Sequence, residues 1–186
     1  IVASGAVFID NSSAFRMDKD IPLVVPEINP EDIFKNKGVI ANPNCSTIIS
    51  LVAINAINKL SKIKAIYAST YQATSGAGVE GPIELRNQMD AIINDKEITN
   101  KVFPYQICEN VIPQIGSFLD NGYTKEEMKM QNEGRKIMHL PELLVTCTCV
   151  RVPVVRSHSI SLTVITEDKL SLSDINNAIA HEKGVK

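Results

Sequence analysis

The sequence has no excess of charge of either sign, no long hydrophobic run and no block of low complexity. Its 186 residues carry 19 basic and 21 acidic side chains, a formal charge of −2, which gives no strong attraction for nucleic acid or an anionic membrane. The longest apolar stretch, residues 48–57, falls well short of the roughly 20 residues that cross a bilayer. We therefore expect no nucleic-acid partner, no membrane span and a packed domain instead of disorder.

A paired-cysteine motif is also missing. The four cysteines stand at positions 45, 108, 147 and 149, and they do not cluster with the three histidines at a metal-ligand spacing. This pattern predicts reduced thiols in a cytoplasmic protein that has no metal site.

The start of the chain has neither an initiator methionine nor a signal segment, because a strand-like apolar run follows Ile1 almost at once. We therefore expect the chain to lack its front. Apolar runs at 5–10 and 38–41 predict two short buried strands. The prolines within residues 21–36 predict a connecting segment without a long helix, because each proline ring removes a backbone donor.

A helix is predicted immediately after the second of these strands. Pro43 and Asn44 supply a turn and an N-cap. The helix that follows covers residues 45–60, and its apolar face is predicted to hold the side chains at 48, 49, 52, 56 and 60.

The rest of the chain alternates between strand and helix patterns. The predicted elements are a strand at 62–71 ending in Gln72, a helix from Pro82 to about residue 94, an irregular excursion at 95–121, a helix from the Thr124/Glu127 capping box to about residue 138, strands at 143–155 and 157–166, and a last helix capped by Ser173 that ends before Gly184. This order predicts a mixed α/β fold.

Cys45 is the strongest candidate for a reactive group. It falls in the first turn of its predicted helix, where unpaired N–H groups and the positive end of the helix dipole favour a thiolate. A small buried residue on the apolar face is an equally good interpretation of the position alone. Cys147 and Cys149 alternate along a strand as packing residues do, and Cys108 lies in the irregular excursion, so these three are interpreted as structural.

His158 follows Arg151 by seven residues, across a break at Pro153. A bend there would bring an imidazole and a guanidinium into one cleft as an acid/base and an anion anchor. A histidine at a strand start is more often a partly exposed surface residue. Arg16 and Lys129 are long cations that could hold a phosphate, although each alone is an ordinary solvated charge.

Gly76, Gly78 and Gly81 form a literal G-x-G-x-x-G between a strand and a helix. We do not interpret it as the dinucleotide-binding fingerprint, because Gln72 precedes it, Pro82 closes it and no clear acidic ribose ligand follows. The glycines still leave a backbone without Cβ atoms, which a flat ligand can approach closely.

Several segments taken together closely resemble the aspartate-semialdehyde dehydrogenase family. They are IDNSSAFR at 9–16, NPNCST at 42–47, YQATSGAG at 71–78, EEMKM at 126–130 and RVPVVRSHS at 151–159, with the less specific FPYQICENVIPQIGSF at 103–118. The resemblance covers nearly the whole chain.

The resemblance implies an enzyme that uses NADP(H) to convert 4-phospho-L-aspartate reversibly to L-aspartate 4-semialdehyde and phosphate, in lysine, threonine and methionine biosynthesis. It implies that Cys45 is the nucleophile of a thioester mechanism, that His158 is the acid/base for the hemithioacetal proton, and that Gln72 positions the substrate.

The same resemblance assigns the binding residues. Arg151 would bind the α-carboxylate of the substrate and Glu126 its ammonium group. The phosphate or acyl phosphate would be held by Arg16, Asn44 and Lys129. The loop against the nicotinamide would be formed by Ser75, Gly76 and Gly78.

The resemblance also implies a domain organisation. Family members begin with a Rossmann unit that carries the genuine glycine motif and end with a helix that returns to it, and neither is found in this sequence. We expect residues 1–43 to be the remnant of the nucleotide-binding domain. Residues 44–186 would be most of an α+β catalytic and dimerisation domain, with a mixed sheet and flanking helices, which forms a homodimer or a tetramer.

Three other interpretations compete with this one. An N-acetyl-glutamyl-phosphate reductase would use the same thioester chemistry, but an acetylated amine carries no charge for Glu126 to pair with. A cysteine hydrolase built on Cys45 and His158 would leave the phosphate-binding cations unexplained. The chain by itself could also be a catalytically inert dimerisation module.

Overall fold

The computed structural model describes residues 2–186. Its internal contacts divide the chain into two compact units. Unit 1 comprises residues up to 67, 128–146 and 162–186, and unit 2 comprises residues 68–127 and 147–161. Three strands contribute residues to both units, namely β3 (Ile63–Gln72), β4 (Leu144–Arg151) and β5 (Ser159–Thr166).

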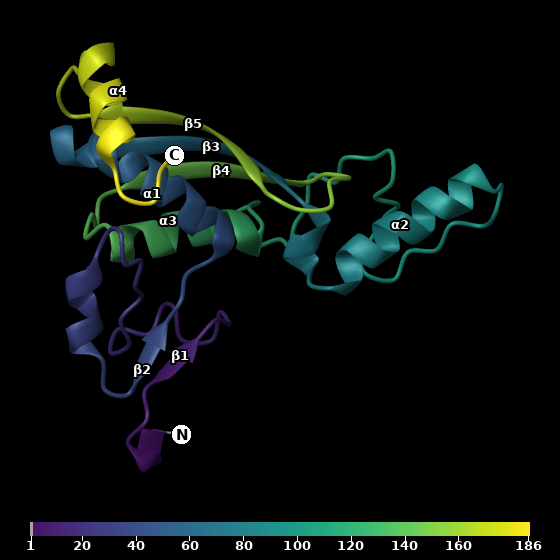
Figure 1. The fold of residues 1–186 in the computed structure, drawn as a ribbon, viewed down its shortest axis with the longest axis horizontal. Helices are drawn as coiled ribbons and strands as arrows, with labels where there is room; N and C mark the ends of the chain where they lie inside the picture. Colours follow the sequence, from purple (N-terminus) through teal and green to yellow (C-terminus); the bar gives the residue numbers. More distant parts are fainter. Residues whose placement is uncertain (1) are drawn as a thin grey trace. The chain divides into compact units, whose positions relative to one another are not determined.

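These three strands form a mixed sheet in the order β4-β3-β5 (Figure 1). The N–H of Val152 donates to the carbonyl of Gln72, so β4 and β3 end side by side and run parallel. The N–H of Glu167 donates to the carbonyl of Lys62, so the end of β5 lies beside the start of β3 and this pair is antiparallel. The predicted α/β class with a mixed sheet is confirmed.

The first part of unit 1 is a separate two-stranded parallel sheet. β1 (Phe8–Asp10) pairs with β2 (Val39–Ala41), and Asp10 lies opposite Ala41. Both strands were predicted. A short 3₁₀ helix, η1 (Val2–Ser4), precedes β1. The connecting segment contains a second, η2 (Pro30–Lys35), whose first residue is a proline that suits a helix start.

α1 (Cys45–Leu60) begins where it was predicted, but its buried face differs from the predicted one. The side chains of Ile49 and Leu60 are 46% and 43% exposed, whereas Leu51 and Ile54 are buried. Ile49 and Leu60 are apolar, so the sequence pattern assigned them to the buried face. They lie at the edge of that face, where the helix is not covered. α1 packs against α4 (Leu172–His181), as Figure 1 shows.

The cap of α4 is Ser171 and not Ser173. The hydroxyl of Ser171 accepts the N–H of Asp174, and its distance from that nitrogen is 3.1 Å. Both serines precede the same apolar pattern, so the spacing of polar residues alone favoured the wrong one. The third predicted helix is α3 (Lys125–Ile137). Its predicted capping box is present, with reciprocal bonds between Thr124 and Glu127.

Unit 2 holds a second core around α2 (Glu80–Ile93). A short 3₁₀ helix, η3 (Thr74–Ala77), precedes α2. The excursion at 95–121 is irregular, as predicted, and its apolar side chains cluster with one residue of α2; the cluster is Leu85, Phe103, Ile107, Cys108 and Ile112. Within residues 2–186, no helix is both long enough and apolar enough to pass through a bilayer.

Two buried polar side chains of α2 hold the backbone of the excursion. The carboxylate of Glu84 accepts the N–H groups of Lys101, Val102 and Phe103 at 2.7, 2.6 and 3.2 Å. The side-chain oxygen of Gln88 accepts two more N–H groups, from residues 107 and 108. Because irregular backbone cannot pair its own N–H groups, these side chains satisfy them.

We predict that Glu84→Gln destabilises the protein by about 2–3 kcal/mol, because an amide accepts fewer of the three N–H groups and carries no charge. Urea unfolding followed by circular dichroism measures this. The matched control is Glu97→Gln, which removes the same charge from an exposed side chain nearby. Equal effects of the two substitutions would contradict the role of Glu84.

Candidate active site

Cys45 is exposed and is the first residue of α1, whereas Cys108, Cys147 and Cys149 are buried. Its neighbour Asn44 is the N-cap, and the side-chain oxygen of Asn44 accepts the N–H groups of Ser46 and Thr47 at 3.1 and 3.3 Å. A thiol at this end of a helix lies where the helix dipole favours negative charge. The exposed position fits the reactive interpretation of Cys45 and not the buried one.

Cys108 and Cys147 lie in surroundings that disfavour a thiolate, whereas the contact with Cys147 lowers the pKa of the buried Cys149. Burial raises the pKa of the Cys108 thiol. The sulfur atoms of Cys147 and Cys149 are 3.6 Å apart on β4, and this contact, followed by burial, raises the pKa of Cys147. These observations agree with their interpretation as packing residues.

Arg16 is buried in unit 1 and its guanidinium is held on three sides. Nε donates to the carbonyl of Asn42 at 2.9 Å, Nη2 to the carbonyl of Asn11 at 3.1 Å, and Nη1 to the carboxylate of Glu133 at 3.2 Å. Arg16 is 8% exposed, so it is not the solvated surface charge that its position in the sequence alone would indicate.

Glu133 is a residue that the sequence reasoning missed. Its carboxylate is 2% exposed and, besides Arg16, it accepts the backbone N–H of Asn44 at 2.7 Å. Burial raises the pKa of Glu133, although the Asn44 N–H and the charges of Arg16 and Lys129 oppose the shift. Lys129 lies one helical turn before Glu133, and this spacing is the only feature of the sequence that indicates a charged partner for Glu133.

In unit 2 the backbone of a single residue, Ala73, contacts two predicted site residues. Its N–H donates to Nδ1 of His158 at 3.0 Å, and its carbonyl accepts Nη1 of Arg151 at 2.8 Å. The two side chains also meet at Gly76, where an added Cβ would lie 2.7 Å from Nη1 of Arg151 and 3.1 Å from Cε1 of His158. The predicted bend therefore does bring the imidazole and the guanidinium together.

The protonation state of His158 follows from these contacts. Since the Ala73 N–H is a donor, Nδ1 must be unprotonated and the neutral ring carries its proton on Nε2. Burial, and then the charge of Arg151, lower the pKa of His158, while the Glu126 carboxylate opposes this. The imidazole is therefore neutral at neutral pH.

Gln72 and Glu126 lie together in the same unit. Gln72 is 2% exposed at the end of β3, and its side-chain Nε2 donates to Glu126 at 3.3 Å. An amide and a carboxylate are thus paired near the strand end, an arrangement that suits a polar substrate.

The glycine loop has two different surroundings. Gly76 is required by the approach of Arg151 and His158, so a protein side chain and not a ligand occupies the space that the missing Cβ leaves. Gly78, with φ of 87°, has no described atom within 4 Å of an added Cβ. Ser75 and Gly78 line an open hollow of about 420 Å³, together with Val79, Pro82, Ile83, Arg86, Val155 and Arg156.

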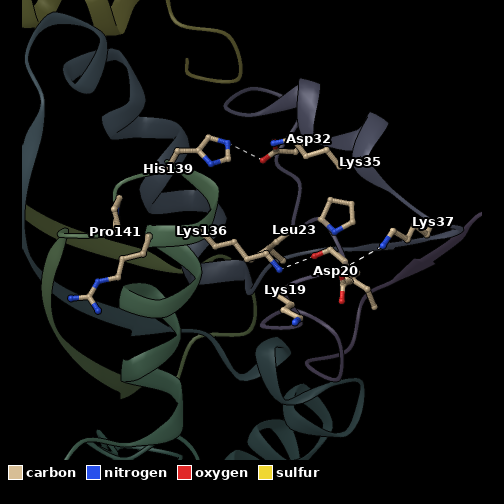
Figure 2. A pocket seen from close by; sticks show the side chains of 12 residues that line it. Lys19, Asp20, Leu23, Asp32, Lys35, Lys37, Lys136, His139 and Pro141 are labelled. Atoms are coloured by element: carbon tan, nitrogen blue, oxygen red, sulfur yellow. Dashed lines mark hydrogen bonds and ion pairs between the residues drawn. The ribbon is translucent and has the colours of Figure 1, made fainter.

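A larger hollow of about 540 Å³ in unit 1 contains none of the predicted site residues (Figure 2). Most of its cations have partners within the protein. Nζ of Lys136 donates to the carbonyls of residues 16, 18 and 21, Lys35 pairs with Asp32, and Lys37 pairs with Asp20. His139 also lies 3.0 Å from Asp32. Among residues 2–186, no three His, Cys, Asp or Glu side chains are grouped to hold a metal ion.

Comparison with known proteins places these features in a family. The model of the semialdehyde dehydrogenase dimerisation domain matches residues 54–186, and that of the semialdehyde dehydrogenase NAD binding domain matches residues 1–36. The chain therefore belongs to the semialdehyde dehydrogenase family, a class of oxidoreductases.

The relatives within this family are named aspartate-semialdehyde dehydrogenases. The Bacillus subtilis protein is 50% identical over 99% of this chain and 56% of its own length, and the Campylobacter jejuni protein is 53% identical over 92% and 51%. The crystal structure of aspartate semialdehyde dehydrogenase II from Vibrio cholerae complexed with ASA has a TM-score of 0.97 and 45% identity, over 99% of this chain and 55% of that one. The chain spans about half the length of the curated relatives it matches.

We predict that nuclear magnetic resonance shows the Nε2–H tautomer of His158 in the folded chain and a pKa below the ordinary value of about 6.5. Arg151→Gln should raise this pKa, because a nearby positive charge is removed. Arg156→Gln, which removes an exposed arginine of the same unit, is the control and should leave it nearly unchanged.

The sign of the pH dependence follows from the direction of the shift. A lowered pKa means that the folded state binds a proton on His158 less tightly than the unfolded state, so its contribution to stability is present above pH 6.5 and is lost as the pH falls below it. A His158 resonance that titrates above the ordinary value would contradict the described surroundings.

Proposed function

We propose that the chain is the substrate-binding and dimerisation part of an aspartate-semialdehyde dehydrogenase. The reaction is the reversible, NADP-dependent reductive dephosphorylation of 4-phospho-L-aspartate to L-aspartate 4-semialdehyde in lysine, threonine and methionine biosynthesis. The observation that carries the proposal is Cys45, exposed as the first residue of a helix whose N-cap is Asn44.

In the reductive direction, the thiolate of Cys45 attacks the carbonyl carbon of the acyl phosphate and phosphate leaves, which forms a thioester. Phosphate departs as an anion, and the cations Arg16 and Lys129 with Asn44 hold it. Support for this step comes from unit 1, where Arg16 is fixed by three bonds that use three of its five N–H donors.

The amino-acid end of the substrate has its own set of proposed residues. Arg151 binds the α-carboxylate and Glu126 the ammonium group, while Gln72 positions the reacting group. His158 handles the hemithioacetal proton. In the neutral tautomer its Nε2–H donates to the carbonyl oxygen and stabilises the negative charge that develops there.

Ser75, Gly76 and Gly78 would form the loop that holds the nicotinamide, with the open space at Ser75 and Gly78, because Arg151 and His158 occupy the space beside Gly76. The hollow beside Ser75 and Gly78 and the open space at the missing Cβ of Gly78 are compatible with a flat ring. NADP(H), when bound, supplies the hydride for reduction and takes it up in the reverse direction. Residues 1–43 belong to the nucleotide-binding domain and residues 44–186 to the catalytic and dimerisation domain, a division that the two family matches at 1–36 and 54–186 support.

We predict that Cys45→Ala abolishes turnover of L-aspartate 4-semialdehyde with phosphate and NADP, because no other described thiol is exposed. The substitution should be made in the complete polypeptide that carries residues 1–186, and reduction of NADP is followed by absorbance. Cys108→Ala is the control, and it should retain turnover. Circular dichroism checks that both variants are folded.

The same assay separates the two acyl-phosphate reductases. Wild-type protein should oxidise L-aspartate 4-semialdehyde and not the N-acetylated glutamate aldehyde, because Glu126 pairs with a free ammonium group. Turnover of the acetylated substrate alone, or wild-type turnover by Cys45→Ala, would overturn the proposal.

The proposed dimer gives a further prediction for the 186-residue chain by itself. Sedimentation velocity should show a species of twice its 20.4 kDa mass, because residues 54–186 match a dimerisation domain. The chain alone should have negligible dehydrogenase activity, since the nucleotide-binding match is confined to residues 1–36. A monomer, or efficient NADP-dependent turnover by this chain, would contradict the proposed division of roles.

A further inference from the structure

Glu133 is hydrogen-bonded to two segments from the N-terminal part of the sequence. Its Oε1 accepts Nη1 of Arg16 at 3.2 Å, and its Oε2 accepts the backbone N–H of Asn44 at 2.7 Å. The residue is 2% exposed. A carboxylate removed from water in this way requires such partners, and here the partners are the proposed phosphate-binding arginine and the residue before the proposed nucleophile.

Arg16 depends on this contact for its orientation. Its other two bonds, from Nε and Nη2, go to backbone carbonyls, which are neutral. Glu133 is the only charged partner in these bonds. Together with the two carbonyls, it fixes the orientation of the guanidinium plane. The donors that these bonds do not use then point in fixed directions, as recognition of a tetrahedral anion requires.

Asn44 depends on the same carboxylate from the other side. Its N–H donates to Glu133 while its side chain caps α1, so the first turn of α1 is connected to α3 through one residue. Cys45 follows directly. One carboxylate therefore sets the spacing between the guanidinium of Arg16 and the turn that carries the thiol.

Stability alone does not explain this arrangement, because burying an ion pair costs about as much free energy as its attraction returns. We propose that Glu133 is a positioning residue for the oxyanion leaving group: it acts through Arg16 and Asn44 and does not contact the substrate. This inference rests on the proposed function and adds a residue to it.

The test is Glu133→Gln in the complete polypeptide, assayed in the oxidative direction with inorganic phosphate as the varied substrate. We expect the KM for phosphate to rise about tenfold while the KM for the aldehyde changes less than twofold, because the amide oxygen can still accept the N–H of Asn44 whereas the amide NH2 cannot accept Nη1 of Arg16. Glu142→Gln removes the same charge from an exposed side chain of unit 1 and should change neither KM.

Two further variants separate positioning from simple loss of packing. Glu133→Asp keeps the charge but shortens the reach, so it should also raise the KM for phosphate, and it replaces Glu133→Gln if that variant does not fold. In an Arg16→Lys background, Glu133→Gln should have little additional effect, because both substitutions disturb the same contact. A lower kcat with unchanged KM values, or fully additive effects, would overturn the inference.

A measurement without turnover distinguishes this failure from failure of the proposed function. Inorganic phosphate should slow alkylation of Cys45 by iodoacetamide in the wild type, and Glu133→Gln should require about ten times more phosphate for the same protection. Wild-type protein that does not oxidise the aldehyde would refute the proposed function. Equal protection by phosphate in the wild type and Glu133→Gln would refute the role of Glu133 alone.

Discussion

The hydrogen bond from the backbone N–H of Asn44 to the buried carboxylate of Glu133 attaches the start of α1 to α3. The side chain of Asn44 caps the helix, so the peptide that is fixed to α3 is the one from which α1 starts. A shift of one residue along the helix would rotate it by about 100°. Cys45 would then leave its exposed first position, and Leu51 would leave the core.

The backbone of Ala73 has a comparable place in unit 2. It holds His158 through its N–H and Arg151 through its carbonyl, and the next N–H, of Thr74, donates to Val154. The loop after β3 thus joins the segment between β4 and β5 by main-chain groups. In each of the two units, the backbone of one residue, Asn44 or Ala73, is bonded to side chains on which the proposals rest.

Most of the fold could be predicted because its signals are local. The proline and asparagine before α1, the Thr124/Glu127 capping box and the alternation along β3 each act within a few residues. The cap of α4 was misplaced by two residues, since Ser171 and Ser173 are equally suitable by type. The exposed side chains of Ile49 and Leu60 could not be foreseen, because exposure depends on which neighbouring element covers each edge of a helix.

Less of the candidate site could be predicted from the sequence. Cys45 could be singled out from its helix position, but the other roles came from resemblance to a family. The Ala73 contacts involve backbone atoms that every residue type except proline supplies, so no letter of the sequence marks them. Glu133 was missed because its partners lie 89 and 117 residues away.

Glu84 and Gln88, unlike Glu133, bind groups that are near them in the sequence. This difference bears on the order in which unit 2 assembles. The peptide groups that they bind lie only 11 to 20 residues further along the chain. Closing such short loops costs little chain entropy. A nascent polypeptide can therefore wrap residues 99–108 around α2 before the strand that carries Arg151 has been synthesised, and the later strand meets a surface that is already in place.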